Sequence, residues 1–475
     1  MSGLAPTSRS PIGPQRWINA AARRLAFDRF ACIDDGQLTL RLGDTETLFG
    51  RATDLRGEAT VHDEAIFRRA ALGGNLALAE GYVDGDWDCD DLTSVLRIFA
   101  RNAASLSATE SGVVGKLVNL VRRFQARRED NSLSGSKRNI AAHYDLGNEF
   151  FRLWLDKTMA YSCGVFPAVS SSLEEASVEK FDRVCRKLNL QPDDRVVEIG
   201  SGWGGFAIHA ASNYGCHVTT TTISPAQFDY ATNAVAAQGL QGRVELLQQD
   251  YRDVAGQFDK LVSIEMIEAV GHQRLDEYFR RCSQLLRSDG SMLIQAIVMP
   301  EQGYDLYLNS IDFIQRHIFP GGCLPSLGSI LASVGRATDL RVVHVEDFAP
   351  HYAETLRRWR QTFRDRLDEV RDIGCTERFI RLWDFYLSVC EAGFEERTIG
   401  VLQVQLDKPR CRREKADLST RIRTDAAYQL ACGRQSNVGY AKIDVEQSEM
   451  RGNTALCESY SNFCFLTSPS SRRRR

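Results

Sequence analysis

The chain has 475 residues and a formal net charge of −3 at pH 7, with 43% hydrophobic and 25% charged residues. These values are ordinary for a folded globular protein and give no sign of a nucleic-acid partner. No apolar stretch approaches the roughly 18 residues of a transmembrane helix, and the N-terminus lacks the apolar core of a secretory signal. The 13 cysteines are odd in number and include no C-x-x-C pair, so we expect reduced thiols in a cytoplasm and no metal site.

Residues 1–110 are predicted to form a small N-terminal α+β domain. The stretch "QLTLRLGDTETLFG" alternates apolar and polar residues, as a half-buried strand does. The segment that follows, "DEAIFRRAALGGNLALAEGYVDGDWDCDDL", has a helical pattern and ends in an acidic turn that contains tryptophan.

Residues 111–136 combine a helical apolar pattern with many cations and end in a small, polar linker. Two interpretations stay open for this basic amphipathic helix. It could be a solvated helix that packs on its own domain, or a helix that lies on an anionic membrane surface.

Residues 137–409 are predicted to form an α/β domain of the Rossmann-like type. From residue 190 onward, the short buried stretches "RVVEI", "HVTTTTI", "RVELLQ", "KLVSI" and "SMLIQAIV" alternate with helical ones. This alternation predicts a parallel sheet with helices on both faces. Residues 410–475 lack sustained periodicity and end in four arginines, so we expect a disordered tail.

A glycine loop follows the first of these strands, in "DRVVEIGSGWGG". Gly200, Gly202 and Gly205 match the dinucleotide spacing, whereas Gly200, Gly202 and Gly204 match the tighter spacing of S-adenosylmethionine (SAM) sites. Both kinds of site need glycine because the backbone turns sharply and approaches the ligand closely. A purely structural glycine turn is a third possibility.

Two features favour SAM over NAD. Glu198, at the end of the first strand, suits a cofactor with an ammonium group and would repel a pyrophosphate. The second strand ends in a run of threonines, without the acid that usually binds the ribose of a dinucleotide. That acid is also usual in SAM enzymes, so Thr222 or Gln227 is expected to contact the cofactor instead.

Several blocks resemble the cyclopropane-fatty-acyl-phospholipid synthase family, which includes the mycolic acid cyclopropane synthases. The resemblance spans about residues 55–409 and rests on "AAHYDLGNEFFRLWLDKTMAYSCGVF", "VVEIGSGWGGFAIHAA", "TTTISPAQ", "SIEMIEAVGH", "IFPGGCLPS" and "PHYAETLRRWR". It implies a SAM-dependent methyltransferase sheet with an N-terminal lipid-handling domain. It also implies transfer of a methylene group from SAM to the cis double bond of phospholipid acyl chains, by a cytoplasmic enzyme peripheral on the inner membrane face. A homodimer is possible by the same analogy.

The expected chemistry needs an apolar site and one base. An alkene that takes the methyl group of SAM becomes a carbocation, and the ring closes when a base removes a proton. The resemblance implies that this base is a bound bicarbonate ion beside Cys163, Glu268, Ile297 and Tyr352. Backbone groups of Cys163 and Ile297 would shape the pocket, Tyr352 would hydrogen-bond the ion, and Glu268 would accept its proton. Glu268 as a helix cap and Tyr352 as a core residue are the plainer alternatives.

One position departs from the family pattern. Many members have histidine where this chain has Gln295, and glutamine forms hydrogen bonds but cannot titrate. The product is therefore open: if ring closure fails, a hydride shift gives a methyl- or methylene-branched chain. Cys390 matches a cysteine once considered a nucleophile in this family, but the residues around it have the pattern of a core helix.

The resemblance also implies the cofactor contacts. Those before the sheet are Tyr161 and Ser162, and those after the third strand are Asp250 and Tyr251, on the adenine side. A lipid-binding regulator that senses SAM without turnover is the alternative from another class. The full set of expected cofactor contacts is Tyr161, Ser162, Glu198, Gly200, Gly202, Gly204, Thr222, Gln227, Asp250 and Tyr251.

Overall fold

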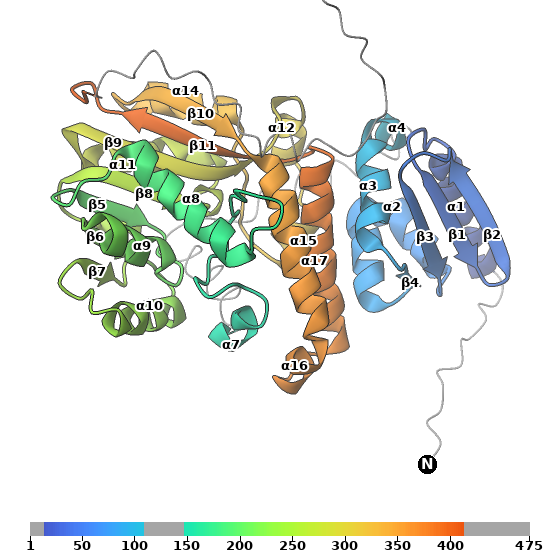
Figure 1. Ribbon diagram of the computed structural model, residues 1–475. Helices are drawn as coiled ribbons and strands as arrows, with labels where there is room; N and C mark the ends of the chain where they lie inside the picture. Colours follow the sequence, from blue (N-terminus) through green and yellow to red (C-terminus); the bar gives the residue numbers. More distant parts are fainter. Residues whose placement is uncertain (1–13, 109–146, 413–475) are drawn as a thin grey trace, which may run out of the picture. The chain divides into compact units, whose positions relative to one another are not determined.

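The computed structural model describes residues 14–108 and 147–412 (Figure 1). The basic helix and linker predicted for residues 111–136, and the tail from residue 413 onward, lie outside the described residues. The domain boundaries given above remain predictions.

The N-terminal elements form a four-stranded sheet with helices, as the α+β prediction requires. The strands are β1 (Gln37–Leu42), β2 (Thr45–Gly50), β3 (Arg56–Val61) and β4 (Trp87–Asp88), in the order β2-β1-β3-β4. The stretch expected to alternate like one strand is a hairpin, because Gly43 turns the chain with a φ of +56°. The helices are α1 (Pro14–Phe30), α2 (Ala65–Asp84), α3 (Leu92–Arg101) and α4 (Ala103–Ala108).

The second sheet has seven strands and is mixed, so the prediction of a parallel sheet was incomplete. Strands β5 (Arg195–Ile199), β6 (His217–Thr221), β7 (Val244–Leu247), β8 (Phe258–Ile264) and β9 (Leu286–Val298) run parallel. Strands β10 (Arg341–Asp347) and β11 (Gly400–Asp407) were not predicted, and both of their pairings are antiparallel. The strand order is β10-β11-β9-β8-β5-β6-β7, so β11 lies inside the sheet between β9 and β10.

Helices cover both faces of this sheet, as predicted (Figure 1). Successive residues of a strand point to opposite faces, so Val196 packs in one cluster with α8 (Leu173–Leu188), α9 (Gly205–Tyr214) and α10 (Pro225–Ala237). Val197 packs in the other cluster with α11 (Leu275–Leu285) and α14 (Leu327–Ala337). This arrangement leaves the carboxyl ends of the parallel strands free to carry a site.

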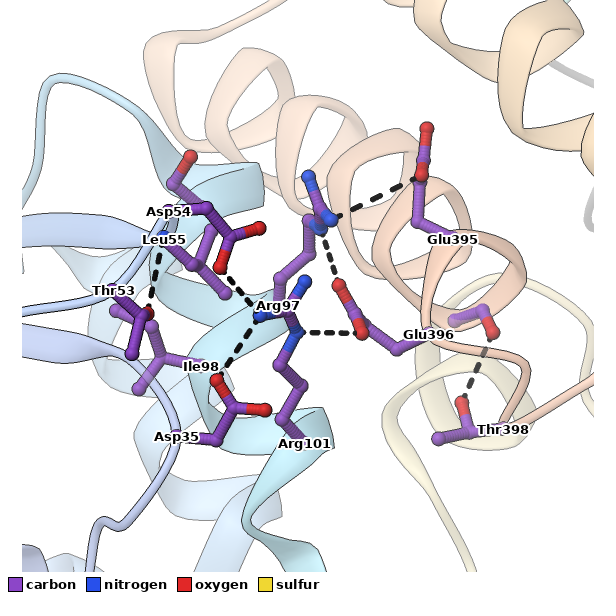
Figure 2. Close-up of polar contacts among 12 residues, drawn as sticks. Asp35, Thr53, Asp54, Leu55, Arg97, Ile98, Arg101, Glu395, Glu396 and Thr398 are labelled. Atoms are coloured by element: carbon purple, nitrogen blue, oxygen red, sulfur yellow. Dashed lines mark hydrogen bonds and ion pairs between the residues drawn. The ribbon is translucent and has the colours of Figure 1, made fainter. Parts of the chain in front are cut away.

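Helices α15 (Ala349–Asp365) and α17 (Glu377–Glu395) pack against each other, and α17 also contacts α2 and α3. Polar contacts join the two sets of elements. Glu396, just past α17, accepts hydrogen bonds from the Nε atoms of Arg97 (2.6 Å) and Arg101 (2.8 Å) on α3 (Figure 2). The Tyr82 hydroxyl donates to Asp384 at 3.0 Å.

Shorter helices complete the described chain. None of the described helices is long and apolar enough to cross a membrane. The shorter elements are α7 (Gly147–Arg152), η1 (Tyr251–Asp253), η2 (Ile267–Ala269), η3 (His272–Arg274), α12 (Glu301–Leu308), α13 (Phe313–His317) and α16 (Leu367–Asp372).

Candidate active site

A cavity of about 550 Å³ opens at the carboxyl ends of β5, β6 and β8. It brings together thirteen of the sixteen residues expected from the sequence; Cys163, Gly204 and Gln295 do not line it. Those that line it are Tyr161, Ser162, Glu198, Gly200, Gly202, Thr222, Gln227, Asp250, Tyr251, Glu268, Ile297, Tyr352 and Cys390.

The glycine loop forms one wall of the cavity. Gly200, Gly202 and Gly204 have φ values of +94°, +49° and +92°, in the region where glycine is favoured. A Cβ atom at Gly202 would meet nothing within 4 Å, so the loop leaves room there for a ligand. Gly204 lies outside the cavity lining and caps the start of α9. Gly205 is not left-handed, and its place is set by packing, because a Cβ atom would come within 2.9 Å of the Thr158 carbonyl oxygen.

Glu198 is buried below this loop and lines the cavity. Its Oε2 accepts a 2.6 Å hydrogen bond from the Thr220 hydroxyl. Burial raises the pKa of Glu198 to about 7, against the effects of Thr220 and of the nearby Lys180 cation. A cationic ligand in the cavity would favour the ionised form of this carboxyl, which fits the ammonium group of SAM.

The expected ribose and adenine contacts lie on the second and third strand ends. The Thr222 hydroxyl donates to Gln227 Oε1 at 3.0 Å, and both side chains are buried. Asp250 is already paired, since its two oxygens accept from the Nε and guanidinium nitrogens of Arg252, each at 2.8 Å. Tyr251 lines the cavity beside it. These residues offer a polar surface that suits a nucleoside.

Lys180 is a fully buried cation that the sequence did not single out. Its Nζ donates to Ser162 Oγ at 2.7 Å. Burial lowers the pKa of Lys180, while the carboxylates of Glu265, Asp156 and Glu198 act in the opposite direction. Lys180 thus supplies positive charge to a site that is rich in acids.

Glu265 is the main site residue that sequence reasoning missed. Its carboxylate accepts three hydrogen bonds: from the Cys163 backbone N–H (2.9 Å), the Gln295 Nε2 (2.7 Å) and the Tyr352 hydroxyl (2.5 Å). Its φ of +50° is rare for a residue with a side chain. The available signal was its position, directly after β8 and inside the quoted block "SIEMIEAVGH".

Gln295 contacts Glu265 and is held by hydrogen bonds at both the nitrogen and the oxygen of its amide. The side chain is fully buried on β9, and its Oε1 accepts from Gln403 Nε2 on β11 at 3.0 Å. Lys187 Nζ in turn donates to Gln403 Oε1 at 2.6 Å. This chain of contacts points the amide N–H₂ of Gln295 at Glu265, so the glutamine acts as a fixed hydrogen-bond donor.

Glu268 lies next to Glu265 but has different partners. Its Oε1 accepts from the Ile297 backbone N–H at 2.6 Å, and its buried Oε2 has no partner among the described residues. Burial and the charge of Glu265 raise the pKa of Glu268 to about 8. Burial also raises the pKa of Glu265, but its three hydrogen bonds and Lys180 oppose that shift. The three donors therefore make Glu265, rather than Glu268, the member of the pair that is better suited to carry the negative charge.

The expected bicarbonate ion does not fit these residues as they stand. Two of its expected partners, the Cys163 N–H and the Tyr352 hydroxyl, already donate to the Glu265 carboxylate. A third, the Ile297 N–H, donates to Glu268. A second anion here would lie beside the Glu265 carboxylate, and three of its expected donors are already used. Nothing in the sequence indicated that a side-chain carboxylate reaches this position.

Cys390 lines the cavity from α17, and burial raises the pKa of its thiol. A neutral thiol is a poor nucleophile, so the geometry gives Cys390 the role of an apolar wall.

The sheet is covered by helices on both faces, and its strand ends carry a glycine loop and a polar surface that suits a nucleoside. Together these features define a SAM-dependent methyltransferase. The family model described as "Mycolic acid cyclopropane synthetase" matches residues 131–404. The chain belongs to this family and is an enzyme that uses SAM to transfer a methyl or methylene group to lipids.

Two relatives cover most of the chain. It is 37% identical over 405 residues to "Tuberculostearic acid methyltransferase UfaA1" of Mycobacterium tuberculosis, with 83% of this chain and 93% of that protein covered. It is 35% identical over 350 residues to "Cyclopropane-fatty-acyl-phospholipid synthase" of Escherichia coli, with 72% and 86% covered. The solved structure of mycolic acid cyclopropane synthase CmaA1 complexed with SAH and CTAB is 31% identical, with 57% of this chain and 98% of that chain covered, at a TM-score of 0.54.

Proposed function

We propose that this enzyme transfers a methylene group from SAM to the cis double bond of unsaturated acyl chains in membrane phospholipids, and closes a cyclopropane ring. The observation that carries this proposal is the pair of buried carboxyl groups, Glu265 and Glu268, in the cavity that also holds the glycine loop. A reaction that creates a carbocation needs negative charge close to it and a group that removes a proton.

SAM supplies an electrophilic methyl group, and the loop around Gly202, with Glu198 and Gln227, is proposed to hold it. The rest of the cavity suits an acyl chain. Leu356, Phe394 and Ile399 are among its apolar lining residues. Such a lining excludes water, which would otherwise trap the cation as an alcohol. No step in this proposal requires bicarbonate, because the donors expected for that ion are taken.

A methyl- or methylene-branched product is the second candidate. It is favoured by the likeness to a protein named tuberculostearic acid methyltransferase, over 93% of that protein's length. In this case a hydride shift along the acyl chain precedes loss of the proton. The same site serves both outcomes, since both begin with methylation of the alkene and end with proton removal. A regulator without turnover is not retained, because the chain belongs to a family of transferases.

A cytoplasmic enzyme that binds the inner membrane face peripherally would meet such substrates. Leu306 on α12 supports contact with lipid, since it is 75% exposed while its neighbour Tyr307 lines the cavity. A homodimer stays part of the proposal by analogy alone.

The test is to express the chain in cells supplied with methyl-labelled methionine and to analyse their lipids by mass spectrometry. A labelled gain of one CH₂ on monounsaturated phospholipid chains would support the proposed reaction. Proton NMR then separates the candidates, because cyclopropane protons differ from branched-methyl and olefinic methylene protons. If the label stays out of acyl chains while the purified protein still binds SAM, the acceptor is a different molecule.

A further inference from the structure

We propose that the carboxylate of Glu265 is itself the base that removes the proton from the newly transferred methyl group, in place of a bound bicarbonate ion. This inference rests on the proposed function and names the group that completes it.

Three hydrogen-bond donors surround the Glu265 carboxylate. The Cys163 N–H, the Tyr352 hydroxyl and the Gln295 amide all converge on one carboxylate that lines the cavity. Charge-assisted hydrogen bonds of this kind hold an anion in one orientation and keep it ionised. The site therefore already contains the fixed anion that the chemistry demands.

The backbone at Glu265 is also held in an unusual conformation. A left-handed conformation at a residue with a Cβ atom costs on the order of 1 kcal/mol or more and persists only where surrounding contacts enforce it. Glu265 has this conformation at the end of β8, with a φ of +50°. The conformation places the carboxylate between β9 and α15, where Gln295 and Tyr352 bind it.

Glu268, by contrast, has few hydrogen-bond partners. Glu268 Oε1 is bonded to the Ile297 N–H, and Oε2 is buried without a partner among the described residues. A carboxyl with one unpartnered buried oxygen is better suited to carry a proton than a charge. We therefore assign the negative charge to Glu265 and the proton to Glu268.

The proposed reaction joins the methylation of the alkene to the loss of one proton. The π electrons of the alkene form a bond to the methyl carbon, the carbon–sulfur bond breaks, and S-adenosylhomocysteine leaves as a neutral thioether. The acyl chain is now a cation. The Glu265 carboxylate takes a proton from the new methyl group, and the electrons of that C–H bond form the third side of the ring. Glu265 ends as a neutral acid and returns its proton to solvent after the product leaves.

The first experiment compares Glu265→Gln with the same chemical change at an exposed position, Glu369→Gln on α16. Glutamine keeps the size of the side chain but cannot accept the proton. We expect turnover to fall about 100-fold or more in Glu265→Gln, within the usual contribution of a general base, while SAM binding by calorimetry is retained. Glu369→Gln should match the parent enzyme. Near-normal turnover in Glu265→Gln would overturn the proposal.

The second experiment uses Glu265→Gly, which suits the left-handed backbone and frees the three donors. We expect this variant to be inactive in buffer stripped of carbon dioxide, and to recover activity when bicarbonate is added. It should also bind isotope-labelled bicarbonate by NMR, whereas the parent enzyme should not. The parent enzyme should work equally well with and without bicarbonate.

The outcomes separate this inference from the proposed function. A parent enzyme that labels lipids only when bicarbonate is present would overturn the role of Glu265 and leave the proposed function intact. A parent enzyme that labels no lipid under either condition would sink the proposed function instead.

Discussion

Glu265 and Glu268 are three residues apart in sequence and differ in protonation because their neighbours differ. Glu265 has three donors, whereas Glu268 has one donor and a charged neighbour. Burial alone would raise both pKa values, so the hydrogen bonds decide which acid is ionised. These neighbours therefore set which of the two carboxyl groups is better suited to act as a base.

Removing the Tyr352 hydroxyl tests this balance. In Tyr352→Phe the carboxylate of Glu265 loses its 2.5 Å hydrogen bond. A hydrogen bond to a charged group contributes about 1.5–3 kcal/mol, so we expect turnover to fall about 10- to 100-fold. Loss of a donor to the charged form also raises the pKa of Glu265. The acidic limb of the pH–rate profile should move to higher pH, and an unmoved limb would mean that Tyr352 only fills space.

The pKa of Glu268 predicts how stability depends on pH. Its pKa rises from the ordinary 4.5 to about 8 on folding. The folded chain therefore binds more protons than the unfolded chain between these values, and the free energy of unfolding falls as pH rises from about 4.5 to about 8. Glu198, with a pKa of about 7, acts in the same direction.

Urea unfolding at a series of pH values measures this slope. In Glu268→Gln the slope should become shallower but not vanish, because Glu198 remains. A variant with the same slope as the parent would show that Glu268 does not carry a raised pKa.

The contact between α3 and the end of α17 joins the N-terminal helices to the cavity wall (Figure 2). Glu396 is largely buried and receives Arg97 and Arg101. Thr398 and Ile399, two and three residues further on, line the cavity. The position of this wall therefore depends on the N-terminal domain.

Replacing Glu396 with alanine should destabilise the chain by about 1–3 kcal/mol, the usual cost of leaving partly buried polar groups without a partner. Turnover with lipid should fall more than affinity for SAM, because Ile399 is among the apolar residues proposed to contact the acyl chain. The matched control is Arg371→Ala, whose partners Asp368 and Glu377 are exposed. That change should stay within about 0.5 kcal/mol by urea unfolding. Equal losses in both variants would remove any special role from the α3–α17 contact.

The sequence predicted the parallel half of the large sheet because its strands are short apolar runs followed by glycine, proline or helical patterns. It did not predict β11, where Gln403 and Gln405 interrupt the apolar pattern although both are buried. Their amides bond to Gln295 and to the Lys187 carbonyl, and such pairing appears only in three dimensions. Glu265 was missed for the same reason, since an acid after a strand looks the same whether it faces solvent or three donors.

The residues that follow the last described strand are held to earlier parts of the chain by hydrogen bonds. Lys408 Nζ bonds Asp339 at 2.6 Å, and the Arg410 N–H bonds the Ser288 carbonyl at 3.2 Å. A chain that ends after Arg412 keeps these contacts. We expect it to have the same thermal midpoint and the same turnover as the full chain, measured by calorimetry and by the lipid assay. A lower turnover at an unchanged midpoint would show that residues 413–475 take part in the reaction.

The position of β11 has a consequence for synthesis of the protein. Strand β11 is inserted between β9 and β10, and its Gln403 orients the Gln295 amide that binds Glu265. A ribosome makes the glycine loop about 200 residues before it makes this strand. Until residues 400–407 emerge, the nascent chain lacks the contact that orients one of the three donors to Glu265. The glycine loop is thus made early, whereas the hydrogen bonds around Glu265 are complete only when the last strand has joined the sheet.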